Sequence, residues 1–162
     1  MSSLQIICKR VCIEPEFLNK NYKEFLFKKI KETTDNECSK EHGYFLDVKR
    51  IVKIIDNNIT SNSEIVFIVE FEVETLLPIK GKDFEGTICM IFNSGIFVNI
   101  KNKLKVLIPL SELTNYTYDS SKNVFIMKDD SEIILKKDIN IKITILDMRY
   151  SKKQFSCFGK II

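Results

Sequence analysis

The chain has 162 residues, of which 44% are hydrophobic and 29% are charged, so it can bury a core and is not disordered by composition. The net charge is only +3, too small to indicate nucleic-acid binding by itself. The charge is uneven, however: residues 1–80 hold 12 Lys/Arg and 13 Asp/Glu, whereas residues 81–162 hold 13 and 9, so a polyanion is expected to contact the second half.

The first predicted elements are a strand and a helix. Leu4 to Ile13 is rich in Ile, Val and Cys and predicts a strand, with Cys8 and Cys12 as small buried side chains. A helix is predicted from Glu14–Glu16, because proline suits a first turn and carboxylates favour the positive end of the helix dipole. Thr33 to Asn36 should end it. Its apolar stripe consists of Leu18, Tyr22, Phe25, Leu26 and Ile30.

Two strands are predicted after the helix. Tyr44 to Ile55 forms the first, and Asp56 to Ser63 forms a polar turn. In the second strand three apolar side chains alternate with three carboxylates, Val69, Phe71 and Val73 with Glu70, Glu72 and Glu74. The carboxylates could be a catalytic or metal-binding set, but we interpret them as the solvated face of an amphipathic strand. This half therefore predicts a β-α-β-β antiparallel sheet with one helix.

The segment Leu77–Lys82 breaks the pattern and predicts a boundary between a domain of residues 1–80 and one of residues 81–162. Beyond it, short antiparallel strands follow at the spacing of a small barrel. The polar stretch Thr114–Lys122 predicts a mobile loop. The expected strands are Phe84–Phe92, Ile96–Ile100, Leu104–Pro109, Asn123–Met127, Glu132–Leu135, Ile139–Met148 and Gln154–Lys160. The fold class is α+β, with a C-terminal OB-type β-barrel.

Residues that carry catalysis or bind metals are scarce. The single histidine, His42, cannot build a metal site with five scattered cysteines. No Gly-rich phosphate loop, HExxH motif or nucleophile elbow occurs, so we predict no catalytic residue, no metal and no cofactor. An odd number of cysteines without a CxxC pair favours a reduced intracellular compartment. No secretory signal or apolar stretch of about 20 residues indicates export or a membrane span.

Three stretches carry a family resemblance. They are Glu14–Phe17 (EPEF), Asn36–Leu46 (NECSKEHGYFL) and Leu77–Ile88 (LPIKGKDFEGTI). With them the chain resembles the larger stalk subunit of archaeal and eukaryotic RNA polymerases, the family of the seventh subunit of RNA polymerase II and its archaeal counterpart. The paralogous stalk subunits of polymerases I and III share this plan. The resemblance implies a truncated RNP-like tip domain, an S-one-type OB barrel and a non-catalytic role in a DNA-directed RNA polymerase.

The resemblance also implies partners. The first domain would dock on polymerase core subunits near the clamp and pair with a smaller stalk subunit where one exists. The barrel would stand near the RNA exit path, and the chain would support initiation. The family uses the turn at Asp56–Ser63 as its tip, so the predicted docking residues are Asp56, Asn57, Asn58 and Asn62. This turn lacks the family's glycines, and asparagine can supply left-handed conformations instead.

Weak binding of single-stranded RNA, without sequence preference, is predicted on one face of the barrel. If Ile96, Val98 and Ile100 fill the core, Phe97 points outward and can stack on a base. Phosphate contacts are assigned to six basic residues, Lys101, Lys103, Lys105, Arg149, Lys152 and Lys153.

The barrel resembles S-one domains at Gly86, Gly95–Val98 and Ser111–Leu113, but two RNA-contacting groups that many members have are missing. An aromatic before the second glycine and a histidine before the serine are replaced by Ser94 and Pro109. Affinity for RNA is expected to be low for that reason.

Two other functions are open: a free-standing RNA-binding OB protein of translation or RNA decay, and an unrecognised enzyme. The β-α-β-β half favours the stalk subunit, since a generic OB module does not need it. The excess of Ile, Lys and Asn is typical of an AT-rich genome, which fits a large DNA virus with its own polymerase. The expected location is the nucleus for a cellular eukaryotic protein, or the virion and host cytoplasm for a viral one.

Overall fold

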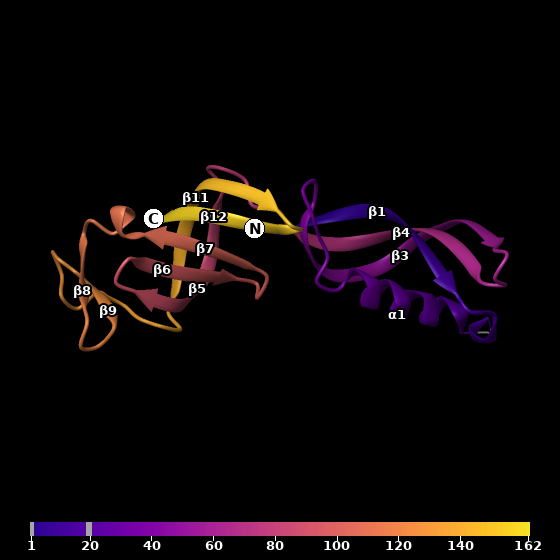
Figure 1. Cartoon of the computed structure of the whole chain (residues 1–162), viewed down its shortest axis with the longest axis horizontal. Helices are drawn as coiled ribbons and strands as arrows, with labels where there is room; N and C mark the ends of the chain where they lie inside the picture. Colours follow the sequence, from indigo (N-terminus) through magenta and orange to yellow (C-terminus); the bar gives the residue numbers. More distant parts are fainter. Residues whose placement is uncertain (1, 19–20) are drawn as a thin grey trace. The chain divides into compact units, whose positions relative to one another are not determined.

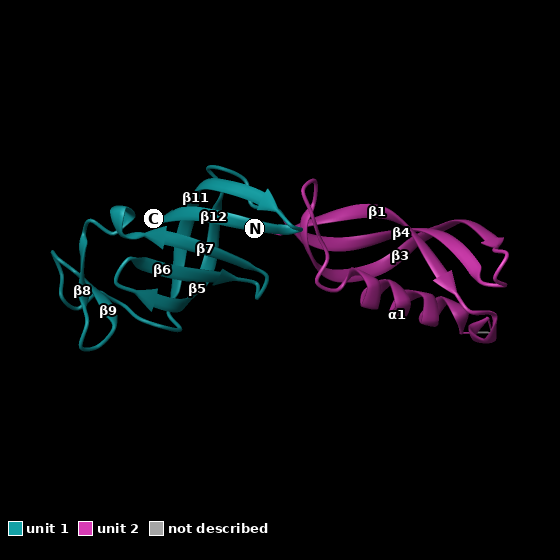
Figure 2. Cartoon of the chain, viewed as in Figure 1, with its two compact units in different colours: residues 1, 77–162 teal, residues 2–76 magenta. Residues whose placement is uncertain are grey.

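The computed structural model describes residues 2–18 and 21–162, which form two compact units, Ser2–Leu76 and Leu77–Ile162 (Figure 2). We call them the sheet unit and the barrel unit. Among the described residues, no helix is long and apolar enough to cross a membrane.

The sheet unit is a four-stranded antiparallel sheet with α1 (Tyr22–Thr34) on one face (Figure 1). The strand order is β1-β4-β3-β2. The strands are β1 (Ser3–Ile13), β2 (Cys38–Ser39), β3 (Gly43–Ile59) and β4 (Ile65–Leu76). The predicted antiparallel sheet with one helix is confirmed, and β2 is a short addition to it.

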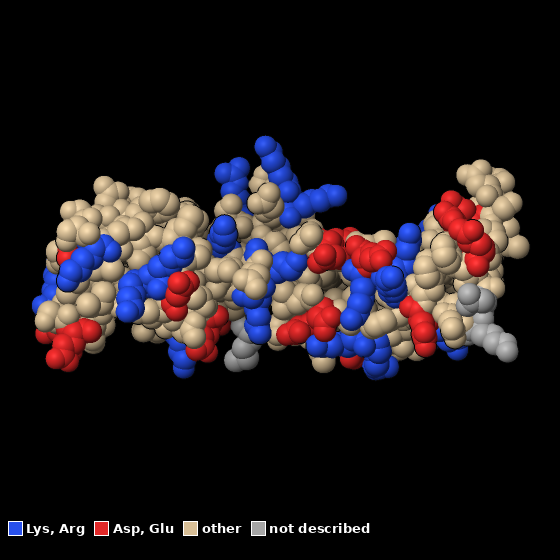
Figure 3. Space-filling model, turned by 90° about the horizontal axis from the view of Figure 1, so that it is seen from below, with Lys and Arg blue, Asp and Glu red and all other residues tan. Residues whose placement is uncertain are grey.

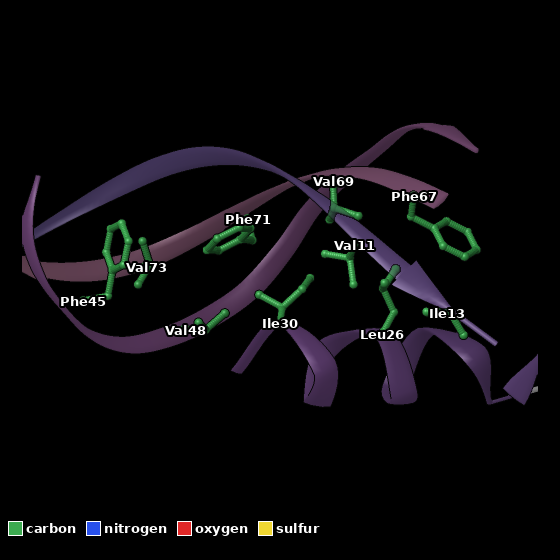
Figure 4. Packing of buried hydrophobic residues seen from close by; sticks show 10 residues of the cluster. All are labelled: Val11, Ile13, Leu26, Ile30, Phe45, Val48, Phe67, Val69, Phe71 and Val73. Carbon is green, nitrogen blue, oxygen red and sulfur yellow. The ribbon is translucent and has the colours of Figure 1, made fainter. Parts of the chain in front are cut away.

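The core of the sheet unit lies between α1 and the sheet (Figure 4). Leu26 and Ile30 are fully buried and lie one turn apart on the helix, so they present one apolar stripe. They face the alternate side chains Val69, Phe71 and Val73 of β4, all fully buried. Branched and aromatic side chains suit such a half-buried strand. The helix is therefore held by packing.

The opposite face of this sheet carries exposed and charged side chains. Leu4 and Ile6 are 57% and 59% exposed. The three glutamates of β4 lie on this face, where Glu72 is 3.6 Å from Arg50 and Glu74 is 3.6 Å from Lys49. They form the charged strand face that the alternation predicts. Cys8 and Cys12 lie on the same face and are exposed, so their expected burial is wrong.

Local boundaries differ from the sequence expectations. Pro15–Phe17 forms a separate 3-10 turn, because the backbone of Leu18 leaves the helical region, and α1 begins only at Tyr22. The expected helix also includes residues 19–20, which lie outside the described residues. Strand β3 continues to Ile59 instead of ending at Ile55, since Ile65–Ile68 of β4 pair with its last residues. Cross-strand pairing here overrides the low strand propensity of aspartate and asparagine.

The barrel unit contains a closed five-stranded barrel, in the order β11-β12-β7-β6-β5 (Figure 1). Its interior side chains alternate along each strand, and Ile88, Ile96, Val106 and Ile143 are fully buried. The predicted OB-type barrel is confirmed. The strands are β5 (Asp83–Phe92), β6 (Gly95–Ile100), β7 (Leu104–Pro109), β11 (Asn140–Ser151) and β12 (Gln154–Ile161).

A small three-stranded sheet is inserted between β7 and β11. It consists of β8 (Tyr116–Asp119), β9 (Val124–Met127) and β10 (Ile134–Leu135), in the order β10-β9-β8, and follows the 3-10 turn Leu110–Glu112. The expected mobile loop Thr114–Lys122 is therefore wrong in part. Tyr116–Asp119 pairs with β9, and the fully buried Phe125 packs against the Tyr118 ring at 5.2 Å.

Candidate nucleic-acid interface

The outer surface of β6 and β7 carries the aromatic residue that the sequence singled out. Ile96, Val98 and Ile100 are at most 2% exposed, so they fill the barrel. Phe97, between them, is half-buried and lies on the outer side of the strand. Its ring meets that of Phe92 edge-on, with centroids 6.1 Å apart. The two ring planes are nearly perpendicular, at 88°, which is a favourable arrangement of an aromatic pair.

The ladder extends this aromatic position into an apolar row across four strands. Met90 of β5 is paired with Phe97 of β6, Phe97 with Leu107 of β7, and Leu107 with Phe158 of β12. Paired residues point to the same side of a sheet, so the row is continuous on the outer face. Phe92 and Phe158 are 47% and 48% exposed. We call Met90, Phe97, Leu107 and Phe158 the outer row.

Basic residues gather at one end of this face. Strands β7 and β12 are parallel, with Val106 level with Cys157. The two hairpin turns that precede these strands therefore lie at the same end of the barrel. One turn holds Lys101 and Lys103, and the other holds Lys152 and Lys153.

Lys105 and Arg149 lie beside the outer row. Lys105 is exposed and stands two residues before Leu107 on the same face of β7. Arg149 is exposed and pairs with Ser156, which stands two residues before Phe158. The structure thus brings all six predicted basic residues to one end of the barrel, on the side of the outer row where the β6–β7 and β11–β12 turns lie. Figure 3, which draws one face, shows Lys and Arg spread over both units. What distinguishes this group is that two of its members, Lys105 and Arg149, border the outer row.

The turns and thiols add two constraints. Lys101, Lys152 and Lys153 all have positive φ values, of 55°, 52° and 59°, a conformation that costs a non-glycine residue energy. Burial and, to a lesser extent, the charge of Asp147 raise the pKa of the Cys157 thiol to about 11. This thiol therefore stays neutral near pH 7 and is no nucleophile.

Sequence reasoning missed Phe92, Leu107 and Phe158 as members of this face. The signal for Phe158 was present, because Phe155, Cys157 and Gly159 alternate with it and are buried. It could be recognised only once the inward side of β12 was known. Phe92 and Leu107 follow from the same two-residue period on their strands.

The second predicted surface is the hairpin that joins β3 and β4. Asp56, Asn57 and Asn58 belong to the last residues of β3, and Asn62 lies in the turn, where Thr60 donates its N–H to the Glu64 carbonyl at 2.8 Å. All four docking candidates are exposed. Sequence reasoning missed Ile59, which is 77% exposed next to the turn. Covering this side chain in a contact would remove apolar surface from water, which is favourable.

Clusters that could hold a metal ion are absent from the described part of the chain. His42 is partly exposed, and its Nε2 atom lies 3.9 Å from the Glu41 carboxylate.

Comparisons with known proteins cover both units. Residues 77–158 match the family described as "S1 RNA binding domain", and residues 9–66 match "SHS2 domain found in N terminus of Rpb7p/Rpc25p/MJ0397". The DNA-directed RNA polymerase II subunit RPB7 of Glycine max is 21% identical over 167 residues, and subunit 7 of Arabidopsis thaliana is 22% identical. Each alignment covers 96% of this chain and 89% of the relative. Among solved structures, the apo form of Mycoplasma genitalium RNase R matches 51% of this chain and 13% of its own, with 20% identity and a TM-score of 0.42.

Proposed function

Because the chain belongs to the RPB7 family of RNA polymerase stalk subunits, we propose that it docks on the polymerase core near the clamp and holds emerging RNA near the exit path. In this role it supports initiation and performs no chemistry itself. The observation that carries the proposal is the end-to-end match to polymerase subunits over 96% of the chain. A free-standing OB protein would not need the sheet unit, whose residues 9–66 match the family's N-terminal domain.

The docking surface in this proposal is the tip of the β3–β4 hairpin. Its polar part consists of Asp56, Asn57, Asn58 and Asn62, and Ile59 supplies an exposed apolar anchor beside them. Anchors that become buried at the centre of an interface contribute most of its binding energy. Loss of Ile59 should therefore weaken docking more than loss of any one of the polar residues.

Affinity purification of the chain from its native source tests the docking proposal. Wild type should recover the large polymerase subunits, and Ile59→Asp should recover them in much smaller amounts because it places a charge in an apolar contact. Ile133→Asp, which alters an isoleucine that is 45% exposed in the other unit, is the matched control. Recovery without any polymerase subunit would refute the stalk assignment. Equal recovery with both variants would refute only the hairpin tip.

The RNA-contacting surface in this proposal is centred on Phe97. A base stacks on its ring, while Lys105, Arg149 and the turn lysines contact phosphates. Stacking of this kind is sequence-tolerant, because every base has a π-face, and phosphate contacts weaken steeply with salt. The proposed binding is therefore weak, without sequence preference and salt-dependent.

Fluorescence anisotropy with a labelled single-stranded RNA tests this surface. Phe97→Ala should weaken binding by about 5- to 150-fold, which corresponds to 1–3 kcal/mol. Lys105→Glu should also weaken it, whereas Lys128→Glu, the same change at an exposed lysine in the inserted sheet region, should have little effect. If the wild type binds no RNA at low salt, the RNA role is wrong while the polymerase assignment stands.

A further inference from the structure

Phe158 is the aromatic residue of the outer row that the proposed function has not used. We propose that it is a second stacking platform for single-stranded RNA, which receives a different base from the one on Phe97. The inference rests on the RNA contact proposed above. It assigns this role to β12, a strand on which no RNA-contacting residue was predicted.

The ladder fixes the spacing of the two rings. Phe97 and Phe158 are each paired with Leu107, from opposite sides. Neighbouring strands lie about 4.8 Å apart, so the two phenylalanine Cα atoms are about 10 Å apart. That separation is too large for one base to cover both rings. A single strand that crosses the barrel would therefore place separate bases on the two rings, with Leu107 between them.

The folding of the barrel explains why residue 158 points outward but not why a phenylalanine occupies that position. Its neighbours Cys157 and Gly159 point inward and are buried, so the side chain of Phe158 must point outward in a closed barrel. Burial of a phenylalanine side chain stabilises a fold, yet this residue stays 48% exposed. A large ring left exposed in a contiguous apolar row indicates an external ligand.

The outer row has basic side chains on both sides, since the exposed Lys160 stands two residues beyond Phe158 on the same face of β12, and this charge favours RNA as the ligand. Lys105 and Arg149 flank the row on the side of the hairpin turns, where phosphates would be attracted. On β11, Asp147 is paired with Phe158 and would repel phosphates. The sugar–phosphate backbone would thus follow Lys105 and Arg149 and avoid Asp147, with the bases turned onto the rings. Ser94 and Pro109 replace an aromatic residue and a histidine that contact RNA in many S-one domains. Phe158 would supply this face with another aromatic surface.

The test measures anisotropy of a labelled twelve-nucleotide oligoadenylate at low and physiological salt. Phe158→Leu keeps the apolar surface but removes the aromatic face, so affinity should fall at least about fivefold. Phe158→Tyr keeps the ring and should stay within about twofold of wild type. Phe17→Leu, which alters a partly exposed phenylalanine of the sheet unit, is the matched control and should have no effect. Thermal unfolding of each variant verifies that it is folded.

Outcomes separate this inference from the function on which it rests. If the wild type binds and Phe97→Ala weakens binding but Phe158→Leu does not, the second platform is wrong and the RNA role survives. If the wild type binds no RNA, both are wrong. If Phe158→Asp loses polymerase subunits while Phe158→Leu keeps its RNA affinity, the ring docks a protein instead. Photo-crosslinking of the wild-type complex gives an independent reading: RNA attached to the peptide with Phe158 supports the platform, and its absence beside a Phe97 crosslink contradicts it.

Discussion

Both units contain a sheet with one apolar face, and each unit buries that face in a different way. In the barrel unit the sheet closes on itself, because β11 pairs with both β12 and β5, so the core is complete without help. In the sheet unit β1 and β2 end the strand order, and one face depends on a single helix for cover. The barrel can therefore carry a binding face on its outside, while the sheet unit leaves edges and a face for partners.

The first prediction uses one buried cysteine in each unit to measure this contrast. Burial raises the pKa of Cys38 and of Cys157 to about 11, so both thiols are protonated and unreactive at pH 8. Pulse alkylation with iodoacetamide should label the exposed Cys8 and Cys12 at least about a thousandfold faster, since the buried pair reacts only after opening. Peptide mass spectrometry measures each rate.

Of the two buried thiols, Cys38 should react first. It lies in β2, which is held to β3 by two residue pairs, whereas Cys157 lies in the closed barrel. Equal alkylation rates for the two thiols would mean that the units open together and would contradict the contrast.

The raised pKa values of Cys38 and Cys157 also make the stability of the fold depend on pH. The stability that they contribute is complete below the ordinary thiol value of 9.0 and is lost as the pH rises towards 11.

The second prediction removes the centre of the sheet unit's core. Phe71 is fully buried in β4, and its replacement by alanine should cost about 3–5 kcal/mol of unfolding free energy. Urea unfolding should show this loss in the transition of the sheet unit alone. The matched control Ile6→Ala, at a side chain that is 59% exposed, should change little. An equal loss of the barrel transition would show that the two units unfold as one.

The third prediction tests how much the close packing around one glycine contributes to the stability of the barrel. Gly95 has a φ of +152°, and a Cβ there would lie 2.4 Å from the backbone oxygen of Ile108. Gly95→Ala should cost about 2–4 kcal/mol, because strain and overpacking add. Gly81 has a φ of +85° with nothing within 4 Å, so Gly81→Ala should cost only about 1 kcal/mol. Calorimetry compares them, and equal costs would contradict the contribution of the close approach.

Much of this architecture follows from the two-residue period of strands. The alternation in β4 predicts its buried and charged faces, and the alternation in β6 places Phe97 on the outer side. What the period cannot supply is which strands become neighbours. The parallel β7–β12 pair joins residues about 50 positions apart and brings the β6–β7 and β11–β12 turns, with their lysines, to the same end of the barrel. Phe158 became part of a row only through that pair.

Polar composition gave wrong predictions in segments whose structure is decided by pairing with a distant strand. The composition of Asp56–Asn58 and Tyr116–Asp119 predicts a turn or loop, yet partner strands recruit both into sheets. The 3-10 turn Pro15–Phe17 shows the opposite error, since a proline that suits a helix start begins only one turn here. In each case the local signal is weaker than the contacts that the rest of the chain supplies.

The last prediction concerns the turn between β11 and β12, where the residues that would stabilise the fold differ from those that would bind RNA. Ser151 and Gln154 are paired, so Lys152 and Lys153 form a two-residue turn with φ values of 52° and 59°. Such a turn favours Asn-Gly, and lysine there is strained. Exchanging the two lysines for Asn-Gly should stabilise the barrel by about 1 kcal/mol yet weaken RNA binding. The salt dependence of RNA affinity should also become shallower, by about 0.7 in slope for each phosphate that is no longer neutralised. A Lys152→Gln, Lys153→Gln double variant removes the charge but keeps the strain, so it should lose RNA affinity without gaining stability. If both variants keep wild-type affinity, these lysines do not contact phosphate, and the basic end of the face reduces to Lys105, Arg149 and their neighbours in the β6–β7 turn.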